Sequence, residues 1–329
     1  MNKRRSIFLA SLLLVLPLCG TAATQATAKD MSIGVSLDNL NDPFWQGIMK
    51  GMQAASKDLG VQLVVRTAEG DAVKQNNQID DLIAQGVAGL DVVYVDNKSI
   101  VQAVKAANKA NIPFVYCDRT LSSQPDAKVA WGIGTDNYAL TANGWKWMAD
   151  YARGKNMHLK VLELVGSLSD ENVLKRTEGF KDVLKSNSDV IDLVQQVPTE
   201  FNLEKALAGT RNALQAHPEI NTIFMHSDYL LGAVISALKQ AGEYKKIGEP
   251  GHVIVMPYSG NKESLEAMKD GYVEMTFGMD VYKEGYESVK AAVEIAKGNK
   301  SYGEPILDPG FIITQENLKE TYKKAYGSF

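Results

Sequence analysis

Cysteine is nearly absent from this sequence, since the 329 residues include only Cys19 and Cys117. Neither sign of charge is in large excess, because 35 basic residues balance 39 acidic ones, and no basic run follows the first five positions. These absences argue against a disulfide-rich scaffold and against a nucleic-acid-binding surface. The 27 glycines and 10 prolines are too few for a collagen-like or disordered chain. A hydrophobic fraction of 45% is typical of a globular protein. The length of 329 residues suggests about two domains.

Motifs of nucleotide-dependent and hydrolytic enzymes are missing as well. No G-x-G-x-x-G follows the first predicted strand, and the chain has no P-loop and no G-x-S-x-G. The four histidines lack metal-ligand spacing. We therefore expect no cofactor, no metal and no enzymatic activity. Asp38 and Asp42 leave one alternative open, a secreted glycosidase-like enzyme, because a pair of carboxylates can cleave a glycosidic bond.

The N-terminus holds the one long apolar run. Lys3, Arg4 and Arg5 precede an apolar stretch over 7–18, and small residues follow up to Ala28. This pattern is typical of a cleavable secretory signal, and the stretch is too short to span a bilayer. We expect residues 1–28 to be a signal peptide, with cleavage after Ala23 as the alternative.

Removal of the signal changes the chain that has to fold. Residues 1–28 hold three basic and no acidic residues, so the mature chain has 301 residues and its net charge falls from −4 to −7. Cys19 leaves with the signal, and Cys117 then has no partner for an intramolecular disulfide. The stability of the exported protein must therefore come from packed cores.

Strands and helices alternate along the mature chain. Asp42 can cap a helix whose first residue is Pro43, apolar residues recur at helical spacing, and Gly60 ends the pattern, which predicts a helix over 43–59. Similar patterns predict a helix over 76–85 and a strand over 129–134 that crosses between two halves. Such βαβ alternation predicts an α/β fold of two doubly wound, Rossmann-like lobes with parallel sheets.

Ligands of doubly wound sheets bind at the carboxyl ends of the strands. The loops that follow the predicted strands combine carboxylates, an arginine, hydroxyls and aromatic rings, a mixture that suits a neutral polyhydroxylated ligand. The candidate ligand-binding residues in these loops are Asp38, Asp42, Phe44, Trp45, Asp118, Arg119, Asn172, Phe201, Ser227, Tyr258, Met279 and Asp280.

Two pairs of adjacent residues among these candidates differ in how strongly they indicate ligand binding. Phe44 and Trp45 point about 100° apart at a helix start, so one can stack on a ligand while the other packs in the core. Asp118 and Arg119 follow an apolar strand, where opposite charges seldom belong to the core. The alternative for this second pair is a surface ion pair.

Several short motifs, taken together, resemble those of a known family, the type I periplasmic sugar-binding proteins of ABC importers, in particular the ribose- and galactose-binding group. The resemblance covers nearly the whole mature chain. The motifs that carry it are Ile33-Gly34-Val35-Ser36, Asn41-Asp42-Pro43-Phe44-Trp45, Asn111-Ile112-Pro113-Phe114-Val115-Tyr116-Cys117-Asp118-Arg119, Thr135-Asp136-Asn137, Arg176-Thr177-Glu178-Gly179-Phe180, Ala216-His217-Pro218 and Ser227-Asp228.

This resemblance implies two lobes, joined by three hinge crossings, that close over a ligand. By motif position, the N-terminal lobe comprises 29–134 plus 281–307 and the C-terminal lobe 135–280 plus 308–329. The family implies a monomeric periplasmic receptor that captures a sugar or polyol and delivers it to an ABC importer permease, with a chemoreceptor as a further partner. A sugar-responsive repressor of the same architecture would need an N-terminal helix-turn-helix, and the predicted signal occupies that place.

Carried over by motif position, Phe44 and Trp45 match the paired stacking aromatics of the family. Asp118 and Arg119 match its Asp-Arg hydroxyl clamp, and Phe201 matches another ring-packing aromatic. These matches lie mainly in the N-terminal half of the implied site.

Departures from the family pattern concentrate in the C-terminal half. A ligand-binding arginine of the family falls on Leu174, so we expect that contact to be lost, with Asn172 or Glu171 as substitutes. Ser227 stands where the ribose group has Asn, and Met279 replaces the hinge Gln. Ribose is therefore not the expected ligand, and a different sugar, a polyol or a modified sugar fits better.

Overall fold

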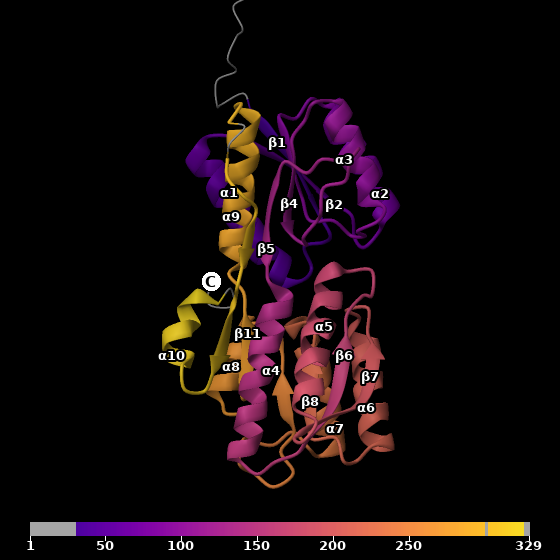
Figure 1. Cartoon of the computed structure of the whole chain (residues 1–329), viewed down its shortest axis with the longest axis vertical. Coiled ribbons are helices and arrows are strands. Elements are labelled where there is room, and N and C mark those ends of the chain that lie inside the picture. Colours follow the sequence, from indigo (N-terminus) through magenta and orange to yellow (C-terminus); the bar gives the residue numbers. More distant parts are fainter. Residues whose placement is uncertain (1–30, 300–301, 326–329) are drawn as a thin grey trace, which may run out of the picture.

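The computed structural model describes residues 31–299 and 302–325, and the predicted signal over 1–28 lies outside them. Two lobes lie one above the other along the long axis (Figure 1). Within the described ranges, every helix is too short or too polar to cross a membrane.

Helices and strands alternate through most of the chain. The strands are β1 Ser32–Leu37, β2 Gln62–Thr67, β3 Gly89–Val92, β4 Phe114–Asp118, β5 Trp131–Thr135, β6 Leu159–Val165, β7 Ile191–Pro198, β8 Thr222–Met225, β9 Ile254–Met256, β10 Tyr258–Ser259, β11 Met275–Gly278, β12 Ile306–Asp308 and β13 Phe311–Thr314. The helices are α1 Pro43–Leu59, α2 Ala72–Ala84, α3 Ile100–Lys109, α4 Asn137–Gly154, α5 Glu171–Ser186, α6 Leu203–Ala216, α7 Leu231–Ala241, α8 Lys262–Lys269, α9 Val281–Ala296 and α10 Leu318–Thr321, with short 3-10 helices η2 Asp228–Leu230 and η3 Tyr322–Lys324.

The sheets confirm the predicted fold class. The upper lobe has one parallel sheet in the order β12-β5-β4-β3-β1-β2, with α1 and α9 packed together on one face and α2 and α3 on the other (Figure 1). The lower lobe has a parallel sheet β7-β6-β8-β9 and a small sheet β10-β11-β13. Among the described strands, β13 is the one that runs antiparallel to its neighbour, β11.

The chain passes between the lobes three times. The passages run from β5 to α4, from β11 to α9 and from β12 to β13, since the partners of each pair belong to different lobes. Two passages are tied together, because the Thr135 hydroxyl donates to Glu284 Oε1 at 2.7 Å. The carboxyl ends of the strands in both lobes therefore face a common cleft.

Helix starts show where local sequence signals decide the structure. Asp42 accepts a hydrogen bond from the amide of Phe44 at 2.9 Å, and Gly60 ends α1 at φ 67°, as the sequence predicts. Helix α2 starts at Ala72 and not at residue 76, because Asp71 caps it by accepting from the amides of Val73 and Lys74. The side chain of Val73 is 71% exposed, so hydrophobic periodicity could not mark this first turn.

Helices α1 and α9 cross with their backbones in contact. A Cβ atom on Gly51 would lie 2.0 Å from the carbonyl oxygen of Tyr282, and one on Gly285 would lie 2.0 Å from that of Ile48. Only glycine permits this approach. The contact holds α9, which has just returned from the other lobe, against the first helix of the chain.

The remaining cysteine lies inside this lobe. Cys117 is fully buried in β4, and burial raises the pKa of its thiol well above the ordinary value. The thiol is therefore shielded from reagents and held in its unreactive, protonated form.

A buried carboxyl lies under the same helix. Asp91 in β3 is fully buried and accepts a hydrogen bond from the Ser288 hydroxyl of α9 at 2.7 Å, while its Oδ1 has no partner among the described residues. Burial raises the pKa of Asp91 from 3.8 to about 7. The folded protein therefore binds a proton here that the unfolded chain has already lost at pH 5.

We predict that Gly51→Ala destabilises the protein by ~2 kcal/mol or more, because the added methyl group forces the two helices apart. Gly154→Ala is the matched control, since no atom lies within 4 Å of its added Cβ, and it should leave stability unchanged or improve it. Thermal denaturation of both variants tests this, and a wild-type melting temperature for Gly51→Ala would contradict it.

A second prediction concerns pH. Because the folded pKa of Asp91 is raised, its contribution to stability is lost as pH rises from about 4 to about 7, on the order of 4 kcal/mol in total. Asp91→Asn removes this loss, so the melting temperature of the wild type should fall relative to that of the variant between pH 5 and pH 8. Parallel pH profiles for the two proteins would disprove the titration of Asp91.

Candidate functional site

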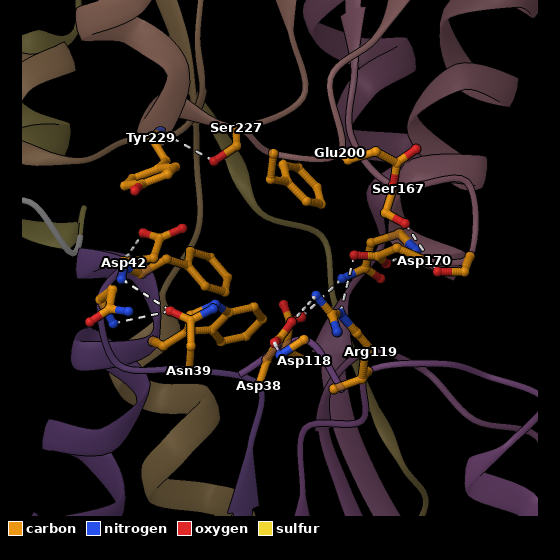
Figure 2. Close-up of a pocket in the computed structure, with 18 of the residues that line it drawn as sticks. Asp38, Asn39, Asp42, Asp118, Arg119, Ser167, Asp170, Glu200, Ser227 and Tyr229 are labelled. Atoms are coloured by element: carbon orange, nitrogen blue, oxygen red, sulfur yellow. Dashed lines mark hydrogen bonds and ion pairs between the residues drawn. The ribbon is translucent and has the colours of Figure 1, made fainter. Parts of the chain in front are cut away.

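A cleft of about 450 Å³ lies between the lobes at the carboxyl ends of the strands (Figure 2). Nine of the twelve predicted site residues line it, namely Asp38, Asp42, Phe44, Trp45, Asp118, Arg119, Asn172, Phe201 and Ser227. The lining also includes residues that the sequence analysis did not single out, among them Asn39, Glu69, Asp170, Arg176, Glu200, Tyr229 and Ser259.

Arg119 is the centre of the polar contacts. Its Nη2 donates to Asp38 Oδ2 at 3.2 Å, its Nε lies 3.1 Å from Asp170 Oδ2, and its Nη1 donates to the carbonyl of Tyr94. The guanidinium also lies 5.1 Å from the centre of the Trp45 ring. Burial lowers the pKa of Arg119, but the two carboxylates outweigh it and raise the pKa above its ordinary value, so this buried group stays charged.

Asp118 is held in an unusual backbone conformation beside it. Its φ is 66°, in the left-handed region that favours glycine. Its Oδ2 accepts from Asn172 Nδ2 at 3.1 Å, whereas its buried Oδ1 has no partner among the described residues. Burial raises the pKa of Asp118 to about 7, although the charge of Arg119 opposes this. An unsatisfied acceptor in the wall of a cleft is a ready partner for a ligand hydroxyl.

These contacts connect the two lobes directly. Asp118 ends β4 in the upper lobe and Arg119 follows it directly, while Asp170 precedes α5 in the lower lobe and Asn172 lies in its first turn. Asp170 also caps α5 by accepting from the amide of Asn172 at 2.9 Å. The Arg119–Asp170 ion pair and the Asp118–Asn172 hydrogen bond therefore fix the approach of one lobe to the other.

Aromatic rings form the apolar part of the wall. Phe44 and Trp45 meet edge to face, with centroids 4.8 Å apart and planes at 89°. Both rings line the cleft, and both are also buried in the hydrophobic core of the upper lobe. Phe201 has φ 56°, and its ring lies where a Cβ atom of residue 166 would be, which keeps that position a glycine.

An arginine from α5 reaches the cleft after all. Leu174 occupies the position at which the family has a ligand-binding arginine, and we expected that contact to be lost. Its side chain is 41% exposed and lies outside the cleft. Arg176 lines the cleft instead, because two residues along a helix turn a side chain by about 200°. Its Nε donates to Asn137 Oδ1 at 2.8 Å and its Nη1 to the carbonyl of His226.

The structure places three of the predicted residues outside the cleft. Tyr258 is buried behind Arg176, whose guanidinium lies 4.1 Å from the ring centre, and it stacks on Phe277. Met279 is fully buried in the hydrophobic core. Asp280 caps α9 by accepting from the amide of Lys283 at 3.0 Å. Their predicted contact with a ligand therefore gains no support from this geometry.

The two carboxylates of the glycosidase alternative already have structural partners. Asp38 accepts from the amide of Gly70 at 3.1 Å and pairs with Arg119, while Asp42 caps α1 through Phe44. Burial, with a smaller contribution from the charge of Asp38, raises the pKa of Asp42 to about 6. Within the described ranges, no group of three acidic, histidine or cysteine side chains could hold a metal ion.

Comparison with known proteins identifies the class. The family model for the periplasmic binding protein domain matches residues 33–300, so the chain belongs to this family. Ribose import binding protein RbsB of Bacillus subtilis is 28% identical over 307 residues, which are 91% of this chain and 95% of that protein. The predicted family resemblance is thereby confirmed.

Two further relatives narrow the class to solute-binding proteins. The xylitol-binding protein of Mycolicibacterium smegmatis is 27% identical over 254 residues, which are 77% of this chain and 68% of that protein. An ABC transporter solute binding protein from Bacillus halodurans, solved with bound myo-inositol, has a TM-score of 0.79 and 26% identity, over 91% of this chain and 99% of that one. The glycosidase alternative gains no support from these comparisons.

We predict that Asp170→Asn loosens the approach of the lobes without unfolding α5. Asn still caps a helix, but its neutral amide loses the ion pair with Arg119. The radius of gyration of the ligand-free protein, measured by small-angle X-ray scattering, should increase. Asp71→Asn, the same change at the cap of α2, is the control, and equal scattering from both variants would show that the ion pair does not hold the lobes.

Proposed function

We propose that this chain captures a sugar or sugar-like polyol between its lobes and delivers it to an ABC-type importer in the periplasm. The observation that carries the proposal is the buried wall in which Asp118 Oδ1, beside two arginines and the rings of Phe44 and Trp45, has no partner within the described part of the chain. Carboxylate and guanidinium groups bind hydroxyls strongly, and aromatic faces cover the C–H faces of a sugar ring. The names of the relatives, which mention ribose, xylitol and myo-inositol, agree with this ligand class.

The lobes we propose comprise 29–134 plus 281–307 and 135–280 plus 308–329. A ligand that touches both lobes favours the closed arrangement, because only there does it gain all its contacts. In this proposal the protein acts as a monomer and catalyses no reaction, its signal peptide directs it to the periplasm, and its partners are the importer permease and a chemoreceptor.

A thermal-shift screen tests the ligand class. Pentoses, hexoses, acyclic polyols and cyclitols are added one at a time, and binding to the native state raises the melting temperature by mass action. A shift with at least one of them supports the proposal, while no shift with any refutes the ligand class. Turnover of a chromogenic glycoside panel would instead establish the enzyme alternative.

We predict that Asp118→Ala and Arg119→Ala each weaken binding of a ligand found in this screen by about a hundredfold or more, since each removes charge-assisted hydrogen bonds from a buried wall. Calorimetric titration measures the affinity. Asp189→Ala, at an exposed ion pair with Arg153, is the control. Wild-type affinity in both cleft variants would place the binding site elsewhere.

A further inference from the structure

The cleft wall carries more negative than positive charge. Its carboxylates are Asp38, Asp42, Glu69, Asp118, Asp170 and Glu200, its guanidinium groups are Arg119 and Arg176, and the lining holds no lysine or histidine. Glu69 lies in an ion pair with Lys74 and is exposed to solvent, as is Glu200. Four aspartates therefore face two arginines inside the cleft.

The two arginines do not neutralise these aspartates evenly. Arg119 pairs with both Asp38 and Asp170. Arg176 donates to the neutral oxygens of Asn137 and His226. One cation therefore pairs with two carboxylates, whereas the guanidinium of Arg176 donates to uncharged acceptors.

Asp42 has no cation beside it among the described residues. Neither Asp42 nor Asp118 is in an ion pair, but the charges of Arg119 and Arg176 act on Asp118. The one charged group that acts noticeably on Asp42 is Asp38, which repels it. Its Oδ1 is used to cap α1, which leaves Oδ2 for the cleft. A partly buried carboxylate in this position is stabilised by any positive charge brought close to it.

The surroundings of Asp42 suit an ammonium group in particular. In Figure 2, Asp42 and Tyr229 lie at the same end of the cleft. Tyr229 belongs to η2 in the lower lobe, opposite the lobe of Asp42. An aromatic ring beside a carboxylate adds a cation–π attraction for a bound amine. A second, independent observation also points to a ligand: Asp118 is 98% buried and lines the cleft, and its Oδ1 has no partner among residues 31–299 and 302–325.

We propose that the ligand is an amino sugar or aminocyclitol whose protonated amine binds Asp42, while its hydroxyls bind Asp118 and the two arginines. This inference rests on the proposed function and narrows it to one substrate class. A neutral polyol can make the hydroxyl contacts, but it leaves the negative charge of Asp42 unbalanced.

Matched ligand pairs test the proposal on the full mature protein. Glucosamine is compared with glucose, galactosamine with galactose, and an inosamine with the corresponding inositol, by calorimetric titration near neutral pH. We expect at least one amine to bind about tenfold or more tightly than its hydroxyl parent. Its N-acetyl derivative, which keeps the substituent but loses the charge, should show no such gain.

The variant Asp42→Asn then tests whether the higher affinity for the amine depends on Asp42. Asn preserves the helix cap and removes the charge, so affinity for the amine should fall about tenfold while affinity for the parent changes less than about threefold. Asp42→Ser, a second uncharged capping residue, should behave in the same way. Asp71→Asn, the equivalent change at the α2 cap outside the cleft, should retain the preference for the amine.

The outcomes separate the two proposals. Tight binding of neutral parents with no gain from the amine refutes this inference and leaves the sugar-binding proposal standing. A preference for the amine that survives Asp42→Asn and Asp42→Ser refutes the assignment to Asp42. Absence of binding by every member of the three pairs, together with a negative polyol screen, overturns both.

Discussion

The guanidinium of Arg119, held between a carboxylate of each lobe, is the contact on which the site depends. It is buried, and a buried cation is tolerated only when its charge is balanced and its donors are used. Asp38 and Asp170 balance its charge, and Asp38 and the carbonyl of Tyr94 accept hydrogen bonds from its two terminal nitrogens. The same contacts set the separation of the lobes and support the Trp45 ring, so the geometry of the cleft follows from the need to satisfy one arginine.

Precise placement of that arginine requires stiff lobes. The backbone contact between α1 and α9 through Gly51 and Gly285 ties the second passage of the chain to its first helix. The hydrogen bond from Thr135 to Glu284 joins two passages beside it. The chain therefore connects the lobes only through short segments at the ends of β5, β11 and β12.

Sequence patterns predicted the fold class and most of the residues that line the upper-lobe side of the cleft, because capping residues and charges after apolar strands act locally. They failed where the outcome depends on helical or strand phase. Arg176, rather than a side chain at 174, faces the cleft because of the rotation of α5, and Ser259 rather than Tyr258 reaches it because successive strand residues alternate. The role of Asp170 as a partner of Arg119 could not be foreseen, since it depends on how closely two lobes approach.

The buried cysteine has a practical consequence for following this motion. Cys117 is enclosed in the core, and its thiol is held protonated. Labelling reagents that require an accessible thiolate should therefore not react with it. A cysteine introduced on the rim of the cleft would then be the one reactive thiol within the part of the chain that the structure describes. A fluorescent dye attached there could report ligand capture in real time, which makes the natural protein a convenient starting point for a biosensor.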